Sequence, residues 1–263
     1  MTPEGTVCVS WGSFWQHCVK SLEPEMGHKE ASAVCAELFF QLAAMDPARR
    51  LMMAPEPMDH LAGKKIERAI RACRSGMPVQ YVTRRARFMD MNLNIRPGVL
   101  IPRPETEELV LWIYDTLKHT AAPEKLHMLD VGCGSGCISL GLARLFRGAK
   151  ITACDIKPAA LNLSRLNARE QVLSQLKFKQ CDILHAADSF LAPLSIDLLV
   201  SNPPYVLESD KKNMEKRVLN FEPPEALFVP DHTPLLFYRA IAEKASIWLK
   251  PGGWLFFEIH ELL

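Results

Sequence analysis

The sequence predicts an α/β fold: a parallel sheet covered by helices on both faces, preceded by a small helical domain. Two observations carry this prediction. From Lys125 onward, short apolar runs alternate with helical patterns, and the runs are apolar almost throughout, as in strands that are buried on both faces. Before about residue 78, apolar residues recur at helical spacing instead.

The first hundred residues predict two helices and a hairpin. One helix is expected over Lys29–Met45 and a second over Lys64–Cys73. From Val79 to Ile101 apolar and polar residues alternate, which predicts a hairpin that links two domains. The expected domains are a helical domain at 1–77, a hairpin linker at 78–104 and an α/β domain at 105–263.

The α/β part predicts five strands, three helices and a turn before the last strand. The expected strands are Leu126–Val131, Lys150–Cys154, Lys177–Cys181, Ile196–Ser201 and Trp254–Ile259. The expected helices are Ile138–Leu145, Pro158–Asn167 and Leu235–Leu249, and Pro251-Gly252-Gly253 predicts a turn.

Composition narrows the class of protein. The chain has 263 residues, 48% of them hydrophobic and 23% charged, with a formal net charge of +1, so no overall field attracts it to nucleic acid or membrane. No apolar window is long enough to span a bilayer, and the first residues lack the pattern of a secretory or targeting peptide. The eight cysteines form no CxxC pair, which indicates a reducing compartment and neither a disulfide framework nor a metal site.

The first chemical motif is a glycine-rich turn between a predicted strand and a predicted helix. It reads Gly132-Cys133-Gly134-Ser135-Gly136, where glycine lets the backbone turn sharply and approach a ligand closely. A dinucleotide fingerprint needs glycines at the first, third and sixth positions. Here they stand at the first, third and fifth, and Asp130 just before them suits a cationic amino acid. The pattern favours S-adenosylmethionine over NAD, with a plain strand-to-helix turn as the alternative.

Two acidic residues end the next strands. Asp155 ends the second strand, where a carboxylate can accept hydrogen bonds from ribose hydroxyls, although it could also cap the helix at Pro158–Asn167. Asp182 ends the third strand and could meet an adenine amino group, or it could be a solvated turn residue.

The second motif is Ser201-Asn202-Pro203-Pro204-Tyr205, at the end of an apolar strand. The two prolines stiffen the loop and leave the Pro203 carbonyl without a place in a regular ladder. The loop thus offers an amide, a free carbonyl and an aromatic face to a planar nitrogen acceptor, either a nucleobase amine or a carboxamide. Orientation and electrostatics would do most of the catalysis, with no metal and no general base.

Together these motifs resemble the amino-group methyltransferases, and three further segments resemble one family among them. Pro97–Val110, Met77–Tyr81 and Phe221–Leu227 are similar to the HemK/PrmC-type protein-(glutamine-N5) methyltransferases, which modify peptide chain release factors. The resemblance runs from about Pro78 to Ile259.

The resemblance implies a Rossmann-like S-adenosylmethionine-dependent methyltransferase domain, with a helical domain that grips the release factor. The acceptor would be the glutamine of the factor's Gly-Gly-Gln loop. The glycine turn would line the methionine portion of the cofactor, Asp155 its ribose and Asp182 its adenine. The catalytic residues would be Asn202, Pro203, Pro204 and Tyr205, and Asn202 would also face the cofactor. Arg103, Pro104 and Glu105 would shape the pocket mouth, although Arg103 could simply pair with Glu107 or Glu108.

Two departures from the family stand out. Arg84, Arg85 and Arg87 stand where the family has a small glycine-containing turn. We expect them at a solvated hairpin tip, with a basic patch that touches RNA as the alternative. The sequence also ends just after the fifth strand, where such sheets normally add a final hairpin. It therefore predicts a C-terminally shortened sheet in which Trp254–Ile259 is an exposed apolar edge that promotes association.

The sequence thus predicts S-adenosylmethionine-dependent methylation of a release-factor glutamine by a monomer in the mitochondrion or the cytoplasm. The partner would be the release factor, with neither a membrane nor direct nucleic-acid binding. One alternative is an adenine amino-methyltransferase, which would be expected to carry a stronger basic groove. Another is a shortened, non-catalytic isoform that binds partners through its helical domain.

Overall fold

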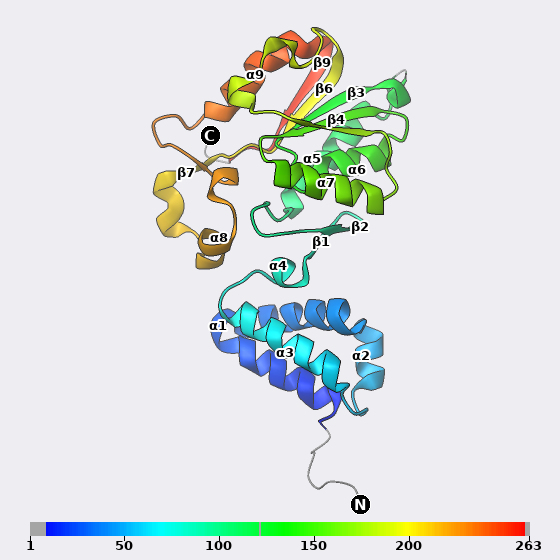
Figure 1. Cartoon of the computed structure of the whole chain (residues 1–263), viewed down its shortest axis with the longest axis vertical. Helices are drawn as coiled ribbons and strands as arrows, with labels where there is room; N and C mark the ends of the chain where they lie inside the picture. Colours follow the sequence, from blue (N-terminus) through cyan, green and yellow to red (C-terminus); the bar gives the residue numbers. More distant parts are fainter. Residues whose placement is uncertain (1–8, 121, 261–263) are drawn as a thin grey trace, which may run out of the picture. The chain divides into compact units, whose positions relative to one another are not determined.

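The computed structural model describes residues 9–120 and 122–260 (Figure 1). The chain divides into two compact units, Met1–Arg84 and Arg85–Leu263. The first unit is helical and the second holds the central sheet.

The helical unit has its own apolar core. Its elements are α1 (Trp11–Ala43), α2 (Pro47–Met53), α3 (His60–Arg74) and α4 (Val79–Thr83). Ser10, Asp46 and Asp59 each accept a backbone N–H at the start of a helix, which satisfies a donor that has no partner inside the helix. Gly27, at φ 77° and ψ 162°, interrupts α1, so the predicted helix at Lys29–Met45 is the second of two helical stretches.

The sequence prediction for Val79 to Thr83 was wrong, because these residues form helix α4 and not the start of a hairpin. Pro78 precedes the helix and cannot donate a ladder hydrogen bond. Val79 and Val82 lie three residues apart and pack against the core of the helical unit. In a segment of five residues, the same apolar positions fit both the helical spacing of three and the strand spacing of two. Packing against the rest of the unit therefore decides whether the segment is a helix or a strand.

The second unit contains the predicted strands and helices, with additions. Its strands are β1 (Arg85–Phe88), β2 (Met91–Asn94), β3 (His127–Val131), β4 (Lys150–Asp155), β5 (Leu176–Gln180), β6 (Ile196–Ser201), β7 (Val206–Leu207), β8 (Phe228–Val229) and β9 (Leu249–Phe257). Its α-helices are α5 (Pro104–Leu117), α6 (Cys137–Leu145), α7 (Pro158–Glu170), α8 (Lys216–Phe221) and α9 (Leu236–Trp248). Short 3₁₀ helices follow at η1 (Pro123–Lys125), η2 (Ile183–His185), η3 (Asp188–Phe190), η4 (Glu208–Asn213) and η5 (Pro224–Ala226).

The central sheet has five strands in the order β5-β4-β3-β6-β9, and every neighbouring pair is parallel. This confirms the predicted parallel α/β sheet. The predicted turn at Pro251-Gly252-Gly253 lies inside β9, where the register with β6 shifts, and the strand ends at Phe257, short of the predicted Ile259. Strand β9 is the outer strand on its side of the described sheet.

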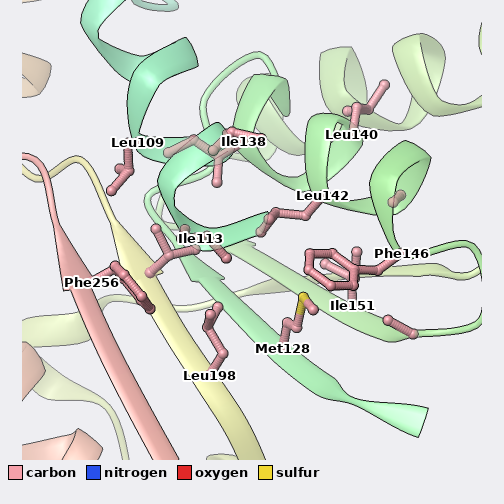
Figure 2. Packing of buried hydrophobic residues seen from close by; sticks show 14 of the residues in the cluster. Leu109, Ile113, Met128, Ile138, Leu140, Leu142, Phe146, Ile151, Leu198 and Phe256 are labelled. Atoms are coloured by element: carbon pink, nitrogen blue, oxygen red, sulfur yellow. The ribbon is translucent and has the colours of Figure 1, made fainter. Parts of the chain in front are cut away.

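Helices cover both faces of the sheet. Successive residues of β3 point to opposite faces, and each face packs against helices. Met128 belongs to a core formed with Ile113 of α5 and Leu142 of α6 (Figure 2). Leu129, the next residue, belongs to a second core with Trp248 of α9. Both β3 residues are fully buried, as expected for a strand covered on both faces.

The hairpin β1–β2 corrects the prediction for the arginines. Its turn consists of Met89 and Asp90, whereas Arg85 and Arg87 lie on β1 and Arg84 is the C-cap residue that follows α4. Arg85 pairs with Glu170 of α7 at 3.0 Å. The arginines therefore do not gather at a solvated tip.

Candidate functional site

The predicted cofactor and acceptor residues lie at the carboxyl ends of β3, β4, β5 and β6, four neighbouring strands of the sheet. In a parallel sheet the carboxyl ends of all strands meet at one edge. The chain runs from β3 through β4 to β5 and then returns to the other side of β3 with β6, so the strand order reverses there. Open α/β sheets bind ligands outside the carboxyl ends at such a reversal.

The glycine turn links β3 to α6 through backbone conformations that favour glycine. Gly132, Gly134 and Gly136 have φ values of 76°, 55° and 85°. The backbone N–H groups of Gly132 and Cys133 both donate to the Cys154 carbonyl, at 2.8 and 2.9 Å. The turn is therefore fixed against the end of β4.

The three glycines differ in what surrounds them. A Cβ atom at Gly132 would meet nothing within 4 Å, and one at Gly134 would meet the Val99 side chain at 3.8 Å. A Cβ atom at Gly136 would lie 2.5 Å from the Leu140 side chain. The first two glycines thus border open space, which fits the close approach of a cofactor to the turn, and the third allows α6 to pack.

We expect Gly132→Ala and Gly136→Ala to separate these roles. Both substitutions place alanine at positive φ, at a cost of roughly 1–2 kcal/mol. Gly136→Ala should lower the free energy of unfolding further because of its close contact. Gly132→Ala should instead weaken S-adenosylmethionine binding more than it lowers stability, because its methyl group enters the open space. Urea unfolding and calorimetric titration measure the two effects, and equal effects of both variants on each would contradict the assignment.

Two polar residues of α7, which the sequence analysis missed, donate hydrogen bonds to carbonyls of the glycine turn. Ser164 donates to the Gly134 carbonyl at 2.8 Å, and Asn167 donates to the Ser135 carbonyl at 2.9 Å. Both side chains are buried. The sequence contained one signal for them. They lie three residues apart on a predicted helix, on the same face as the apolar residues Leu161 and Ala168, which indicates polar side chains that are buried.

Asp155 joins the glycine turn to the next loop. Its Oδ2 accepts the Gly134 N–H and its Oδ1 accepts the Lys157 N–H, both at 2.9 Å. The alternative role as cap of α7 does not hold, because Lys157 is the capping residue and has no side-chain cap. Each carboxylate oxygen accepts more than one hydrogen bond, so the carboxylate keeps acceptor capacity for hydroxyl groups.

Asp182 lies after β5 and satisfies its own turn. Its carboxylate accepts the Leu184 N–H at 3.0 Å and contacts His185 Nδ1 at 2.8 Å. This geometry is the turn alternative considered from the sequence, and the side chain remains about one-third exposed.

Asp130, which the sequence analysis placed beside the amino acid portion of the cofactor, is buried beneath the glycine turn. It is fully buried, and its Oδ2 accepts both the backbone N–H and the hydroxyl of Ser139 at the start of α6. Its Oδ1 and the nearby Ser135 Oγ have no partner within residues 9–120 and 122–260. The prediction that Asp130 directly contacts a cationic amino acid was therefore wrong, because the side chain has no exposed surface for a ligand to touch.

Burial raises the pKa of Asp130 to about 7, and the nearby charge of Asp155 acts in the same direction. Since this pKa lies above the unfolded value of about 4, the folded state binds more protons between about pH 4 and pH 7. Stability should therefore fall as pH rises through this window. Urea unfolding at several pH values should show this slope in the wild type and a smaller one in Asp130→Asn. An unchanged slope would refute the assignment.

The Asn202 loop is held by side-chain hydrogen bonds to two other segments, the start of α5 and the residue that follows β9. Asn202 Nδ2 donates to Thr106 Oγ1 at 3.3 Å, and the Tyr205 hydroxyl donates to Glu258 Oε1 at 3.1 Å. Burial, with the Glu258 charge second, raises the pKa of Tyr205, so the phenol stays neutral and donates. Pro203 is buried, and in the described part of the chain no backbone N–H of a turn or loop donates to its carbonyl.

The wall beside this loop contains an ion pair that the sequence analysis did not foresee. Arg103 Nη2 lies 2.5 Å from Oε1 of Glu222, whose side chain is 2% exposed. The alternative pairing with Glu107 or Glu108 is wrong, because Arg103 pairs with Glu222; Glu107 accepts the Met89 N–H at 2.7 Å. Pro104 and Glu105 begin α5 immediately after Arg103.

A short parallel pair fixes the chain beyond the loop. Val206-Leu207 of β7 pairs with Phe228-Val229 of β8. The pair ties the exit of the Asn202 loop to the segment that follows Glu222, so the loop, the ion pair and the start of α5 form one connected structure. Among the described residues, no cluster of three histidine, cysteine or acidic side chains could hold a metal ion, and no helix has the length and apolar character needed to cross a membrane.

Comparison with known proteins finds relatives that match most of this chain. A family model described as "Methyltransferase domain" matches residues 123–253. A release factor glutamine methyltransferase of Bacteroides thetaiotaomicron is 44% identical over 198 residues, 75% of this chain and 68% of that protein. Those of Flavobacterium psychrophilum and Bacillus subtilis are 36% and 31% identical, over 88% and 89% of this chain and 78% and 80% of those proteins.

Proposed function

We infer the activity of this chain from its family, because it belongs to the release factor glutamine methyltransferases. It transfers a methyl group from S-adenosylmethionine to the side-chain amide nitrogen of a glutamine in a peptide chain release factor. The observation that carries this function is the convergence of the glycine turn and the Asn202 loop at one edge of the sheet.

S-adenosylmethionine supplies an electrophilic methyl group on a positively charged sulfur. The glycine turn would hold its amino acid portion, with Gly132 and Gly134 giving backbone access. Asp155 would accept the ribose hydroxyls while it keeps its bonds to the Gly134 and Lys157 backbones. Asp182 would lie nearest the adenine. It would contribute less to cofactor binding than Asp155, because its carboxylate already contacts residues of its own turn.

The acceptor glutamine would bind at the Asn202 loop. A primary amide carries two N–H groups, and two acceptors are offered there, the Asn202 side-chain oxygen and the Pro203 carbonyl. Two hydrogen bonds fix the plane of the amide, so that its nitrogen presents one face to the methyl group. The Tyr205 ring packs beside this plane, and its neutral hydroxyl is occupied by Glu258.

The two units suggest a division of labour. We propose that the helical domain at 1–77 recognises the release factor, that 78–104 links it to the rest and that 105–263 performs the transfer. The independent core of the helical unit supports this proposal. We also propose a monomer that does not bind nucleic acid directly, in the compartment where its substrate acts, the cytoplasm or the mitochondrion.

Acceptor choice tests the function. The chain should incorporate labelled methyl groups into a release factor and into none of its variants in which the Gly-Gly-Gln glutamine is replaced by alanine or glutamate. An adenine-containing oligonucleotide, offered alone and in competition, should neither accept methyl groups nor inhibit. Incorporation into the oligonucleotide, with none into the release factor, would establish the adenine alternative instead.

A further inference from the structure

The Glu258 carboxylate connects three parts of the acceptor site. Its Oε2 accepts the hydroxyl of Thr106 from the first turn of α5 at 2.7 Å, and its Oε1 accepts the Tyr205 hydroxyl at 3.1 Å. Its backbone is fixed on both sides, because its N–H donates to Ser201 and its carbonyl accepts the Tyr238 hydroxyl. The carboxylate therefore has a set position just beyond the end of β9.

Thr106 passes this constraint to Asn202. The single Thr106 hydroxyl proton is committed to Glu258, so toward Asn202 the hydroxyl oxygen acts as an acceptor. It receives the Asn202 Nδ2–H at 3.3 Å. A flipped amide would instead set two acceptor oxygens against each other. Thr106 is 2% exposed, so water is poorly placed to relieve that repulsion.

We propose that Glu258 and Thr106 are positioning residues for glutamine methylation. They hold the Asn202 amide with its nitrogen toward Thr106, which leaves its oxygen as the acceptor for the substrate N–H. Glu258 holds the Tyr205 ring by the same carboxylate. The carboxylate accepts the two hydroxyl protons with separate oxygens, whereas a glutamine would have a single acceptor oxygen. This inference rests on the proposed function, because it assigns these residues to the glutamine acceptor.

The first test replaces Thr106. Thr106→Val keeps the shape and removes the hydroxyl, so kcat should fall about tenfold to a hundredfold, while the Kd for S-adenosylmethionine stays within about twofold of the wild type. Thr106→Ser restores the hydroxyl and should recover most of the rate. Thr116→Val is the matched control, because Thr116 lies on the same helix and its hydroxyl bonds only to the Trp112 carbonyl in the preceding turn; its rate should equal that of the wild type.

The second test asks whether the effect passes through Asn202. In an Asn202→Ala background, Thr106→Val should cause almost no further loss, because the amide that it orients is gone. Glu258→Gln should behave like Thr106→Val and should be non-additive with it. Loss of the same factor in both backgrounds, failure of Thr106→Ser to recover the rate, or a wild-type rate in Thr106→Val would overturn this inference while leaving the function intact. A wild-type chain that methylates no glutamine would overturn both.

Discussion

Replacing Asn202 by alanine is expected to lower the rate of glutamine methylation about a hundredfold or more. The substitution removes one of the two acceptors that would fix the plane of the substrate amide. S-adenosylmethionine binding should change much less, because the glycine turn and Asp155 are held by contacts with β4 and α7 that do not involve Asn202.

The measurement is methyl incorporation into a release factor under saturating cofactor, with calorimetric titration of the cofactor alongside. Asn213→Ala is a suitable control, because Asn213 is an exposed residue of η4 outside the acceptor site. Equal activity of wild type and Asn202→Ala would remove Asn202 from the site. A parallel loss of cofactor affinity would move its role to the cofactor.

The second large effect is expected at Asp155. Asp155→Ala should weaken S-adenosylmethionine binding by roughly 2–3 kcal/mol, if its carboxylate takes charge-assisted hydrogen bonds from the ribose. The substitution also removes the acceptor for the Gly134 and Lys157 N–H groups, so loosening of the glycine turn adds to the loss.

Asp182→Ala provides the comparison. Its carboxylate is already engaged by Leu184 and His185, and we expect a smaller loss of affinity than for Asp155→Ala. Calorimetric titration of both variants with S-adenosylmethionine and with NAD distinguishes the possibilities. Binding of NAD without binding of S-adenosylmethionine would overturn the interpretation of the glycine spacing.

The sequence predicted the inner strands of the sheet well because they are apolar almost throughout. Ile196–Ser201 and Lys150–Cys154 are buried along almost their whole length, and such runs between helical patterns have few other solutions. The segment from Val79 to Thr83 was harder, because local spacing in five residues does not separate helix from strand. Its helix depends on packing against α3 and against α1, and α1 ends at Ala43, far from this segment in the sequence.

The site was predictable where motifs are local and not where its contacts are remote. The glycine turn and the Asn202 loop are contiguous, so their residue types and order could be read directly. Thr106 and Glu258 stand 152 positions apart, and Arg103 and Glu222 stand 119 apart; neither pair follows from spacing. Asp130 shows that a residue beside a local motif can also be misplaced, because its side chain is buried in the core although the motif borders the site.

Fragmentation mass spectrometry of the release factor after incubation with this chain and S-adenosylmethionine should find one added methyl group, located on the side-chain nitrogen of the glutamine in the Gly-Gly-Gln loop. With Asn202→Ala at most a trace of it should appear. A methyl group on another residue, or an unmodified factor in the presence of a chain that binds S-adenosylmethionine, would contradict the proposed function.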